Sequence, residues 1–418
     1  MSEGTFRSLR NPSYRAWAAG SLVSNLGSWV QRTAQDWLVL TQLTHHNATQ
    51  LGVVMALQFG PHFVLLPFTG WAADRFDRRR ILVATQSAMF VLAAVLGLLT
   101  LTGVVALWHV DAFALLLGCV TAFDAPASQT FVSELVGEED LSNAVGLNST
   151  SFNVARMVGP AIAGVLLASV GTGWAFMVNA LSYLAVLFAL WRLRAHARHA
   201  SAHARPKAGG FVDGLRYVRG RPDLTAILVM LFLIGTFGLN FTIFISTMAV
   251  SVFHQGAGRY GLLMSIMAIG TISGSLLAAR RRRPRIEILF TSAMLFGVGC
   301  ALAAVMPDYW LFGAALMLIG VSALTFANST NSLLQLGTEP AMRGRVMAMR
   351  MAIAMGGTPI GAPIVGWVAD TAGPRWALGV GAASGFAAAA VLVRHLARHR
   401  RLRLRVAHGR LRIQLDPA

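Results

Sequence analysis

Four ionisable side chains inside apolar segments are the residues of this chain best placed to do chemistry. Arg32 and Asp36 lie one helical turn apart, and Asp124 and Arg156 lie near the middle of two later segments. A charge at the centre of a bilayer costs at least about 2.5–3.5 kcal/mol unless it is paired or hydrated. The first two can pair on one helix face. The other two come within pairing range if their helices are antiparallel.

The chemistry expected of these residues is the binding and release of a proton. Burial favours the neutral form of a carboxyl group, whereas a neighbouring arginine favours the ionised form. A protein that moves the two apart would load and unload a proton at Asp36 or Asp124, of which Asp124 is the deeper. The alternative is a static ion pair or a hydrated charge without a role in coupling. The second half of the chain does not mirror these charges.

The composition is that of a membrane protein. Of the 418 residues, 55% are apolar and only 12% are charged, whereas soluble domains have about 25% charged residues. Apolar segments of about 20 residues, the length that crosses a hydrocarbon core, recur along the chain. In lipid each segment must satisfy its own backbone hydrogen bonds as a helix. The sequence therefore predicts an all-α membrane protein.

Twelve transmembrane helices in two pseudo-symmetric six-helix bundles are predicted. They span residues 15–42, 50–72, 81–103, 111–132, 143–168, 173–192, 224–246, 259–279, 286–306, 309–334, 345–369 and 376–396. The breaks divide the chain into an N-terminal bundle (1–192), a cytoplasmic linker (193–223), a C-terminal bundle (224–398) and a basic cytoplasmic tail (399–418). Within the linker, an amphipathic helix on the membrane surface is expected over 211–221.

The distribution of basic residues predicts the orientation of the chain. Except for Arg32, Arg156, Arg259 and Arg375, the lysines and arginines lie at one side of the predicted membrane. By the positive-inside rule this side is cytoplasmic. We therefore expect a multi-pass protein of the bacterial cytoplasmic membrane with both termini in the cytoplasm. Topology and contact with anionic membrane lipid then explain the net charge of +18, and nucleic acid is not an expected partner.

The two halves resemble each other in sequence. At an offset of 202 residues, positions 159, 164, 171, 174 and 175 carry the same residues as positions 361, 366, 373, 376 and 377. The shared Gly-x-x-Trp-Ala register is a stronger signal than glycines alone. Parallel repeats of this kind place a substrate path at their interface near the midplane.

Polar uncharged residues within the predicted helices are candidates to line this path. They are Asn25, Gln31, Gln35, Gln58, Asn240, Asn328, Asn331 and Gln335. The last three are spaced by three and four residues and so share a helix face. Hydrogen bonding between helices explains any one of these residues equally well.

Sequence motifs of enzymes, cofactors and metal sites are missing. The chain has no Gly-x-x-x-x-Gly-Lys-Ser/Thr phosphate loop, no His-Glu-x-x-His and no cysteine pair at metal-ligand spacing. Cys119 and Cys300 each lie in an apolar segment, as small buried hydrophobes do. We expect no cofactor and no metal, and we expect an ion gradient or the substrate gradient to supply the energy.

A short charged loop after the second predicted helix resembles the loop between helices two and three of the major facilitator superfamily. The residues that match are Gly70, Asp74, Arg75, Arg78 and Arg79. Asp77 departs from the pattern, because the family more often has glycine there. In the family this loop latches the two halves on the cytoplasmic side, which assigns the latch to Asp74 with Arg78 and Arg79 as charge partners. A positive-inside anchor is the alternative, but it explains only the arginines.

A second resemblance lies in the predicted fifth helix. Gly159, Pro160 and Gly164 resemble the Gly-Pro-x-x-Gly-Gly element of facilitator-superfamily antiporters, with Ala163 replacing one glycine. Small residues permit close helix approach, and Pro160 removes a backbone hydrogen bond and kinks the helix. The resemblance implies export, and ordinary small-residue packing is the alternative.

Further stretches resemble the bacterial branch of the superfamily that contains the enterobactin exporter. They are residues 35–40, 122–129, 141–144 and 214–219. These stretches cover the first half and the linker. They imply the fold, whereas the cargo differs between members of one branch.

These features together lead us to expect a transporter, not an enzyme, that works by alternating access as a monomer. The expected activity is proton-coupled export of an amphipathic small molecule, such as a drug, a siderophore or a secreted metabolite. A uniporter or importer of a small solute is the first alternative. The second is a membrane sensor or lipid-translocating scaffold that keeps the fold without transport.

Overall fold

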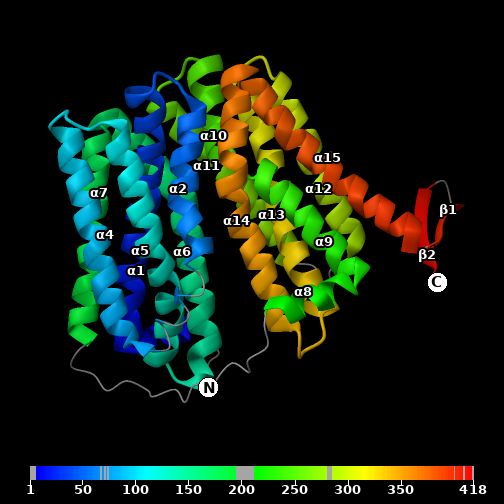
Figure 1. Cartoon of the computed structure of the whole chain (residues 1–418), viewed down its shortest axis with the longest axis horizontal. Coiled ribbons are helices and arrows are strands. Elements are labelled where there is room, and N and C mark those ends of the chain that lie inside the picture. Colours follow the sequence, from blue (N-terminus) through cyan, green and yellow to red (C-terminus); the bar gives the residue numbers. More distant parts are fainter. Residues whose placement is uncertain are drawn as a thin grey trace. The chain divides into compact units, whose positions relative to one another are not determined.

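The computed structural model describes residues 6–65, 68–69, 72, 75–193, 211–279, 285–399, 401–407 and 410–416, and these are almost entirely helical (Figure 1). The helices are α1 (Pro12–Trp37), α2 (Ala48–Val64), α4 (Arg78–Leu101), α5 (Leu107–Leu135), α6 (Glu138–Ser169), α7 (Thr172–Arg192), α8 (Phe211–Arg219), α9 (Pro222–Leu233), α10 (Phe241–Thr247), α11 (Ala257–Ala279), α12 (Ile286–Val305), α13 (Tyr309–Gly337), α14 (Arg343–Thr371) and α15 (Pro374–His399). The predicted helical class is confirmed.

The membrane-spanning character of the helices follows from their length and hydropathy. Within the described residues, 10 helices are long and apolar enough to cross a membrane. α1 is more polar than these, and α2 has only 17 residues. The total of twelve spans therefore stays a prediction.

The predicted seventh helix differs most from expectation. α9 continues as the π-helical η4 (Ile234–Gly238), and the helix is interrupted at Leu239 and Asn240. It resumes as α10 and ends in the π-helical η5 (Met248–Val252), six residues beyond the predicted end. A side chain at position 238 would lie 2.7 Å from the Phe296 ring of α12, so packing requires glycine there. Interruptions of this kind are frequent at functional sites.

Among the described residues, strands occur in the C-terminal segment. β1 (Arg401–Ala407) pairs antiparallel with β2 (Arg410–Asp416), with Arg401 opposite Asp416. The sequence from 401 to 406 alternates arginine with an apolar residue, which is the period of a strand. Charge alone predicted a basic tail here and missed this periodicity.

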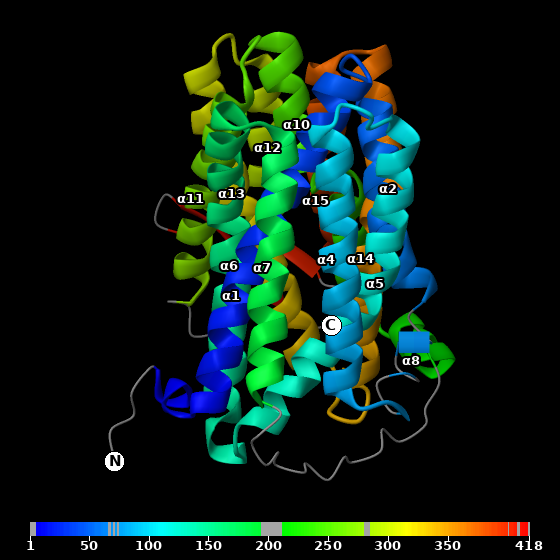
Figure 2. The same cartoon turned by 90° about the vertical axis from the view of Figure 1, so that its left-hand side faces the viewer.

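The helices form two compact units, each described by itself. The first unit comprises Met1–Pro206, Thr242–Ala268 and Ala362–Thr371, and the second comprises Lys207–Phe241, Ile269–Gly361 and Ala372–Ala418. In the first unit, α7 lies between α1 and α4, while α5 packs on both α4 and α2 (Figure 2). The Trp17 and Phe131 rings meet edge to face at 5.0 Å in its core. This packing fixes the helices that carry the four intramembrane charges.

The start of the chain is anchored to the beginning of α6. Arg7 forms an ion pair with Asp140 at 2.9 Å, and the Ser8 hydroxyl donates to Asn143 Oδ1 at 2.7 Å. The Tyr14 hydroxyl donates to the carbonyl oxygen of Ala144 at 2.8 Å. The stretch 141–144, noticed only as a family resemblance, therefore holds the N-terminal segment in place.

The second unit is built around α12, which packs between α13 and α15. The predicted amphipathic helix is present as α8, although it ends at Arg219. A side chain at Gly214 would lie 3.1 Å from Arg345 Cβ, so α8 closely approaches the start of α14. Arg221, directly after α8, donates to Asp223 at 2.8 Å and to the carbonyl oxygen of Gly337 at 3.1 Å. These contacts tie the linker helix to α9 and α13.

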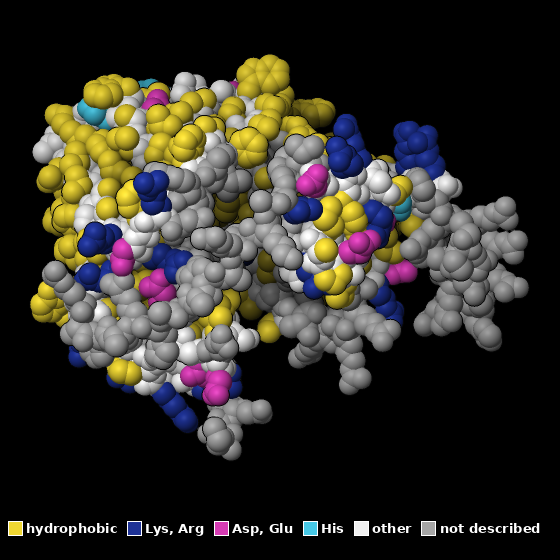
Figure 3. Space-filling view, turned by 60° about the horizontal axis from the view of Figure 1, so that its bottom comes forward, with side chains coloured by type: hydrophobic (Ala, Val, Ile, Leu, Met, Phe, Trp, Pro, Cys, Tyr) yellow, Lys and Arg dark blue, Asp and Glu magenta, His cyan; other side chains and the backbone are white. Residues whose placement is uncertain are grey.

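Charged side chains gather at one end of the helices. Figure 3 turns the lower end of Figure 1 toward the viewer and shows basic and acidic side chains there, while apolar side chains cover the parts above. Arg78 begins α4 and Arg192 ends α7 at such charged helix ends. The cytoplasmic assignment of this end stays a prediction.

Candidate functional site

The charged loop is described from Arg75 onward, with Gly70 and Asp74 lying outside the described residues. Asp77 is the N-cap of α4, and its Oδ1 accepts from the Arg80 backbone N–H at 3.0 Å. The residue that departs from the family's glycine thus has a local role at the start of the helix. A side-chain cap starts the helix here, because one of its otherwise unpaired N–H groups is satisfied.

Removal of this cap gives a measurable loss of stability. Asp77→Ala is expected to lower the free energy of unfolding by about 1 kcal/mol, and Asp77→Gly by only a few tenths, because glycine is itself tolerated at the N-cap. Thermal unfolding of the purified protein in detergent measures both variants. Equal stability of Asp77→Ala and the unsubstituted chain would contradict the capping role.

Two arginines of the loop bind the ends of neighbouring helices. Arg78 Nη1 forms an ion pair with Glu134 Oε1 of α5 at 2.5 Å, and both side chains are largely buried. Arg79 donates through Nε and Nη2 to the carbonyl oxygen of Leu190 in α7 at 2.9 and 2.8 Å. The arginines thus join α4 to α5 and α7 within the first unit. Sequence inspection missed Glu134, although it is an acid close to the end of an apolar segment.

The antiporter-like motif lies in the C-terminal half of α6, which continues through Pro160 without interruption. A side chain at Gly159 would lie 2.5 Å from Trp29 Cβ of α1. One at Gly164 would lie 2.8 Å from Gly261 Cα of α11. Both glycines therefore serve close helix packing, as their residue type predicted.

Arg32 is flanked by aromatic rings. Its guanidinium carbon lies 5.0 Å from the Trp29 ring centre and 5.3 Å from that of Phe59, in cation–π geometry. Asp36 is buried one turn further along α1. Although both are described, no ion pair within 4 Å joins them, because the arginine side chain is directed to the rings.

Asp124 has neutral partners. Its Oδ1 accepts from Thr85 Oγ1 at 2.6 Å and from Gln86 Nε2 at 3.1 Å, both on α4. The Gln86 Oε1 atom is buried and has no hydrogen-bond partner among the described residues. The bridge to Arg156, which antiparallel helices would allow, is not formed within 4 Å among the described residues. The hydrogen bonds instead join α4 to α5, and Thr85 and Gln86 had not been predicted as site residues.

The polar residues of α1 divide into two groups. Gln31 accepts a hydrogen bond from Asn179 Nδ2 of α7, which also donates to the Tyr183 hydroxyl at 3.2 Å. Gln31 thus belongs to a buried network that holds α1 to α7, and Asn179 was missed from the sequence. Gln35 Nε2 has no partner among the described residues, and neither does Gln58 Nε2 of α2. Asn25 is half-buried.

The remaining candidates lie in the second unit. Asn240 is buried at the interruption of the seventh helix, where its Nδ2 donates to the carbonyl oxygen of Thr236 at 2.7 Å. In α13, Asn328 and Asn331 are half-buried, whereas Gln335 is exposed close to the helix end. The three residues of α13 are therefore not equally buried.

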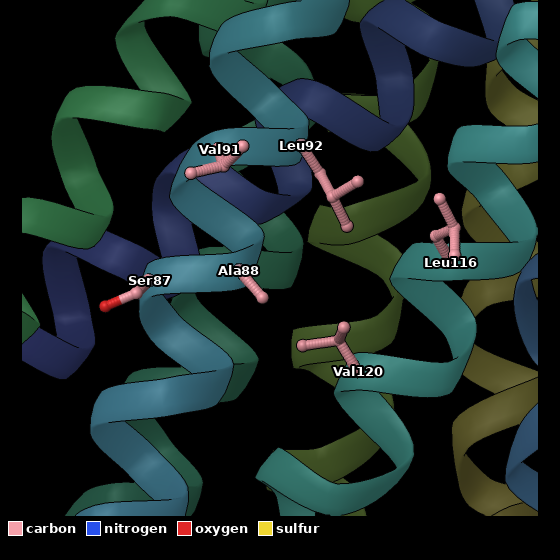
Figure 4. A pocket seen from close by; sticks show the side chains of 6 residues that line it. All are labelled: Ser87, Ala88, Val91, Leu92, Leu116 and Val120. Atoms are coloured by element: carbon pink, nitrogen blue, oxygen red, sulfur yellow. The ribbon is translucent and has the colours of Figure 1, made fainter.

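A shallow groove between α4 and α5 contains none of the predicted site residues. Figure 4 shows its lining, which is Ser87, Ala88, Val91, Leu92, Leu116 and Val120. The lining is almost wholly apolar, as a lipid-facing surface is. Arg32, Asp36 and Asp124 do not line this groove.

The sequence and the fold of the chain are similar to those of known proteins. The model of a family described as transmembrane secretion effector matches residues 3–406. A staphyloferrin A transporter of Staphylococcus aureus is 28% identical over 85% of this chain and 89% of its own length. An enterobactin exporter of Shigella flexneri is 25% identical over 85% of each chain. A solved structure of a bacterial homologue of the human lysosomal transporter Spinster has the same fold, with a TM-score of 0.71 at 16% identity over 95% of this chain and 96% of its own.

Proposed function

Because the chain belongs to the transmembrane secretion effector family of the major facilitator superfamily, and so is a multi-pass membrane transporter, we propose that it exports an amphipathic small molecule in exchange for protons. The observation that carries the coupling is the environment of Asp124. Export is supported by the similarity to an enterobactin exporter and by Gly159, Pro160 and Gly164 in α6.

Asp124 is suited to exist in both protonation states. The ionised carboxylate accepts from Thr85 and Gln86, which are neutral donors. A protonated carboxyl has one O–H to donate, and Gln86 Oε1 is an unpaired buried acceptor on the same neighbour. Because no arginine among the described residues lies within 4 Å to fix the ionised form, the proton can bind and leave as the surroundings change. Asp36, close to Arg32, is the second candidate for the proton site.

The substrate site that we propose is centred on Arg32. The Trp29 and Phe59 rings offer apolar surface around the guanidinium, and the unpaired amides of Gln35 and Gln58 offer hydrogen bonds. A ligand with both apolar and polar parts fits such a lining. Asn25, Asn240, Asn328, Asn331 and Gln335 remain proposed as further residues of the path.

The charged loop is proposed as the gate at the arginine-rich end. Gly70, Asp74 and Arg75 match the family pattern, and Arg78 and Arg79 connect the loop to α5 and α7. We assign this end to the cytoplasm, together with both termini, in the bacterial cytoplasmic membrane. The chain is proposed to work as a monomer.

Transport in proteoliposomes tests this function. Compounds retained differently by cells with and without the protein provide the substrates. We expect their accumulation in proteoliposomes with an imposed pH gradient, and its collapse when the gradient is dissipated. Transport that persists without the gradient would indicate a uniporter. If no compound moves while the protein binds lipid or another protein, a sensor or scaffold is the better description.

A further inference from the structure

Two pairs of helices cross at small residues within the first unit. In the α2–α14 crossing, a side chain at Gly52 would overlap the carbonyl oxygen of Ala362, and one at Gly366 would overlap that of Ala48. The crossing lies at the N-terminal end of α2, the end away from the charged loop that precedes Arg78. The backbones are therefore in direct contact at this end.

The α6–α11 crossing is the counterpart of this contact. A side chain at Gly164 would lie 2.8 Å from Gly261 Cα, and one at Gly261 would lie 3.0 Å from the carbonyl oxygen of Pro160. At the repeat offset of 202 residues, Gly164 and Pro160 correspond to Gly366 and Ala362. On the side of α6 and α14, the two crossings thus use equivalent positions of the repeat.

The crossings differ at one position. In the α2–α14 crossing, Asp370 Oδ1 accepts from the Ala48 N–H at 2.7 Å, and Oδ2 accepts from the Thr49 N–H at 2.8 Å and from the Thr49 hydroxyl. The residue equivalent to Asp370 is Ala168. Its methyl group lies 3.7 Å from the place where a side chain at Gly258 would be, and it offers no hydrogen bond. Only one of the two crossings is closed by a carboxylate.

Asp370 accepts hydrogen bonds from backbone N–H groups at the N-terminus of α2 that would otherwise have no partner. The first N–H groups of a helix have no partner within it. Here the Gln50 N–H donates to the side chain of the N-cap, Asn47, at 2.9 Å, and the Leu51 N–H donates to the Asn47 carbonyl oxygen. The two remaining donors, Ala48 and Thr49, are satisfied by the residue from α14. A negative charge at a helix N-terminus is favourable for the same reason.

We propose that Asp370 is a one-sided latch that holds the N-terminal end of α2 to the C-terminal end of α14 and is released in each transport cycle. Its role as part of a cycle rests on the proposed function. A transporter that alternates must open the end of the bundle at which these backbones touch. Because of the hydrogen bonds to the carboxylate, the α2–α14 crossing is held together more strongly than the α6–α11 crossing. Breaking these hydrogen bonds is therefore the step that allows that end to open.

Distance measurements between spin labels test the latch without a substrate. The labels are placed on cysteines at the exposed Thr102 and Trp376, in a chain carrying Cys119→Ala and Cys300→Ala. Asp370→Ala removes three hydrogen bonds between α14 and α2, one of them to a hydroxyl. We therefore expect the ratio of molecules with a short distance between the labels to molecules with a long distance to fall roughly five- to thirty-fold. Thr49→Val removes only one of the bonds and should give a smaller shift in the same direction.

Asp308→Ala is the matched control. Asp308 is also a helix-capping carboxylate, but it caps its own helix, α13, by accepting from the Trp310 N–H at 2.7 Å. It should leave the distances unchanged. Unchanged distances in both Asp370→Ala and Thr49→Val would overturn the latch. Because these measurements require no transport, a shift seen in a chain that moves no compound would support the latch while the proposed function fails.

Discussion

Asp124→Asn is expected to abolish the pH-gradient dependence of transport while downhill movement of the substrate continues. The amide keeps the size of the side chain and can still bond to Thr85 and Gln86, but it cannot carry a proton. One pH unit is worth about 1.36 kcal/mol per proton. For one-for-one exchange, a gradient of about one unit therefore supports roughly tenfold accumulation in the unsubstituted protein, whereas the variant should only equilibrate its substrate. Uptake into proteoliposomes at equal and unequal pH measures both.

A second aspartate of the same helix provides the control. Asp111 is near the start of α5 and has no hydrogen-bonding connection to Thr85 or Gln86. Asp111→Asn should leave coupling intact. Accumulation in Asp124→Asn equal to that of the unsubstituted chain would remove Asp124 as the proton site and direct attention to Asp36.

The helices were predictable because hydropathy and length govern them directly. α12, predicted over 286–306, is found at Ile286–Val305. The interruption at Asn240 was not predictable in the same way, since it lies next to Gly238, where the Phe296 ring of a distant helix packs closely. The local sequence is enough to predict where a transmembrane helix lies, whereas an interruption within it depends on contacts with other helices.

The sequence predicted which residues belong to the candidate site, but not which groups contact them. Intramembrane charges are conspicuous, and this singled out Arg32 and Asp124. The two ion pairs that the sequence allowed are not formed within 4 Å among the described residues: aromatic rings flank Arg32, and Thr85 and Gln86 of α4 reach Asp124. A hydrogen bond between helices depends on their relative rotation, which hydropathy does not determine.

Two features of the sequence could have pointed to Asp370. It is an acid at the end of the predicted eleventh helix, and the repeat places Ala168 at the equivalent position. Asp74 of the charged loop likewise has an uncharged counterpart, Ala278, at an offset of 204 residues.

Gly361→Ala is expected to prevent stable folding of the second unit. A methyl group on Gly361 would overlap the carbonyl oxygen of Thr236 in η4, and backbone cannot rotate aside as a side chain can. Overpacking of this kind costs typically 1–3 kcal/mol, and more where backbone must shift. We expect about 3 kcal/mol or more, seen as loss of monodisperse protein after extraction in detergent and as a lowered unfolding temperature.

Two other glycines show whether backbone contact causes this effect. Gly379→Ala in α15 should be neutral or stabilising, because the nearest atom is 3.7 Å away and alanine is the better helix former by about 1 kcal/mol. Gly159→Ala, at the position equivalent to Gly361, meets the Trp29 side chain and should cost less than Gly361→Ala. Similar stability of Gly361→Ala and Gly379→Ala would contradict a required approach of α14 to η4. A large loss of stability in Gly361→Ala alone would show that the two glycines, although at equivalent positions of the repeat, have different neighbours. Gly159 faces a side chain, whereas Gly361 faces backbone.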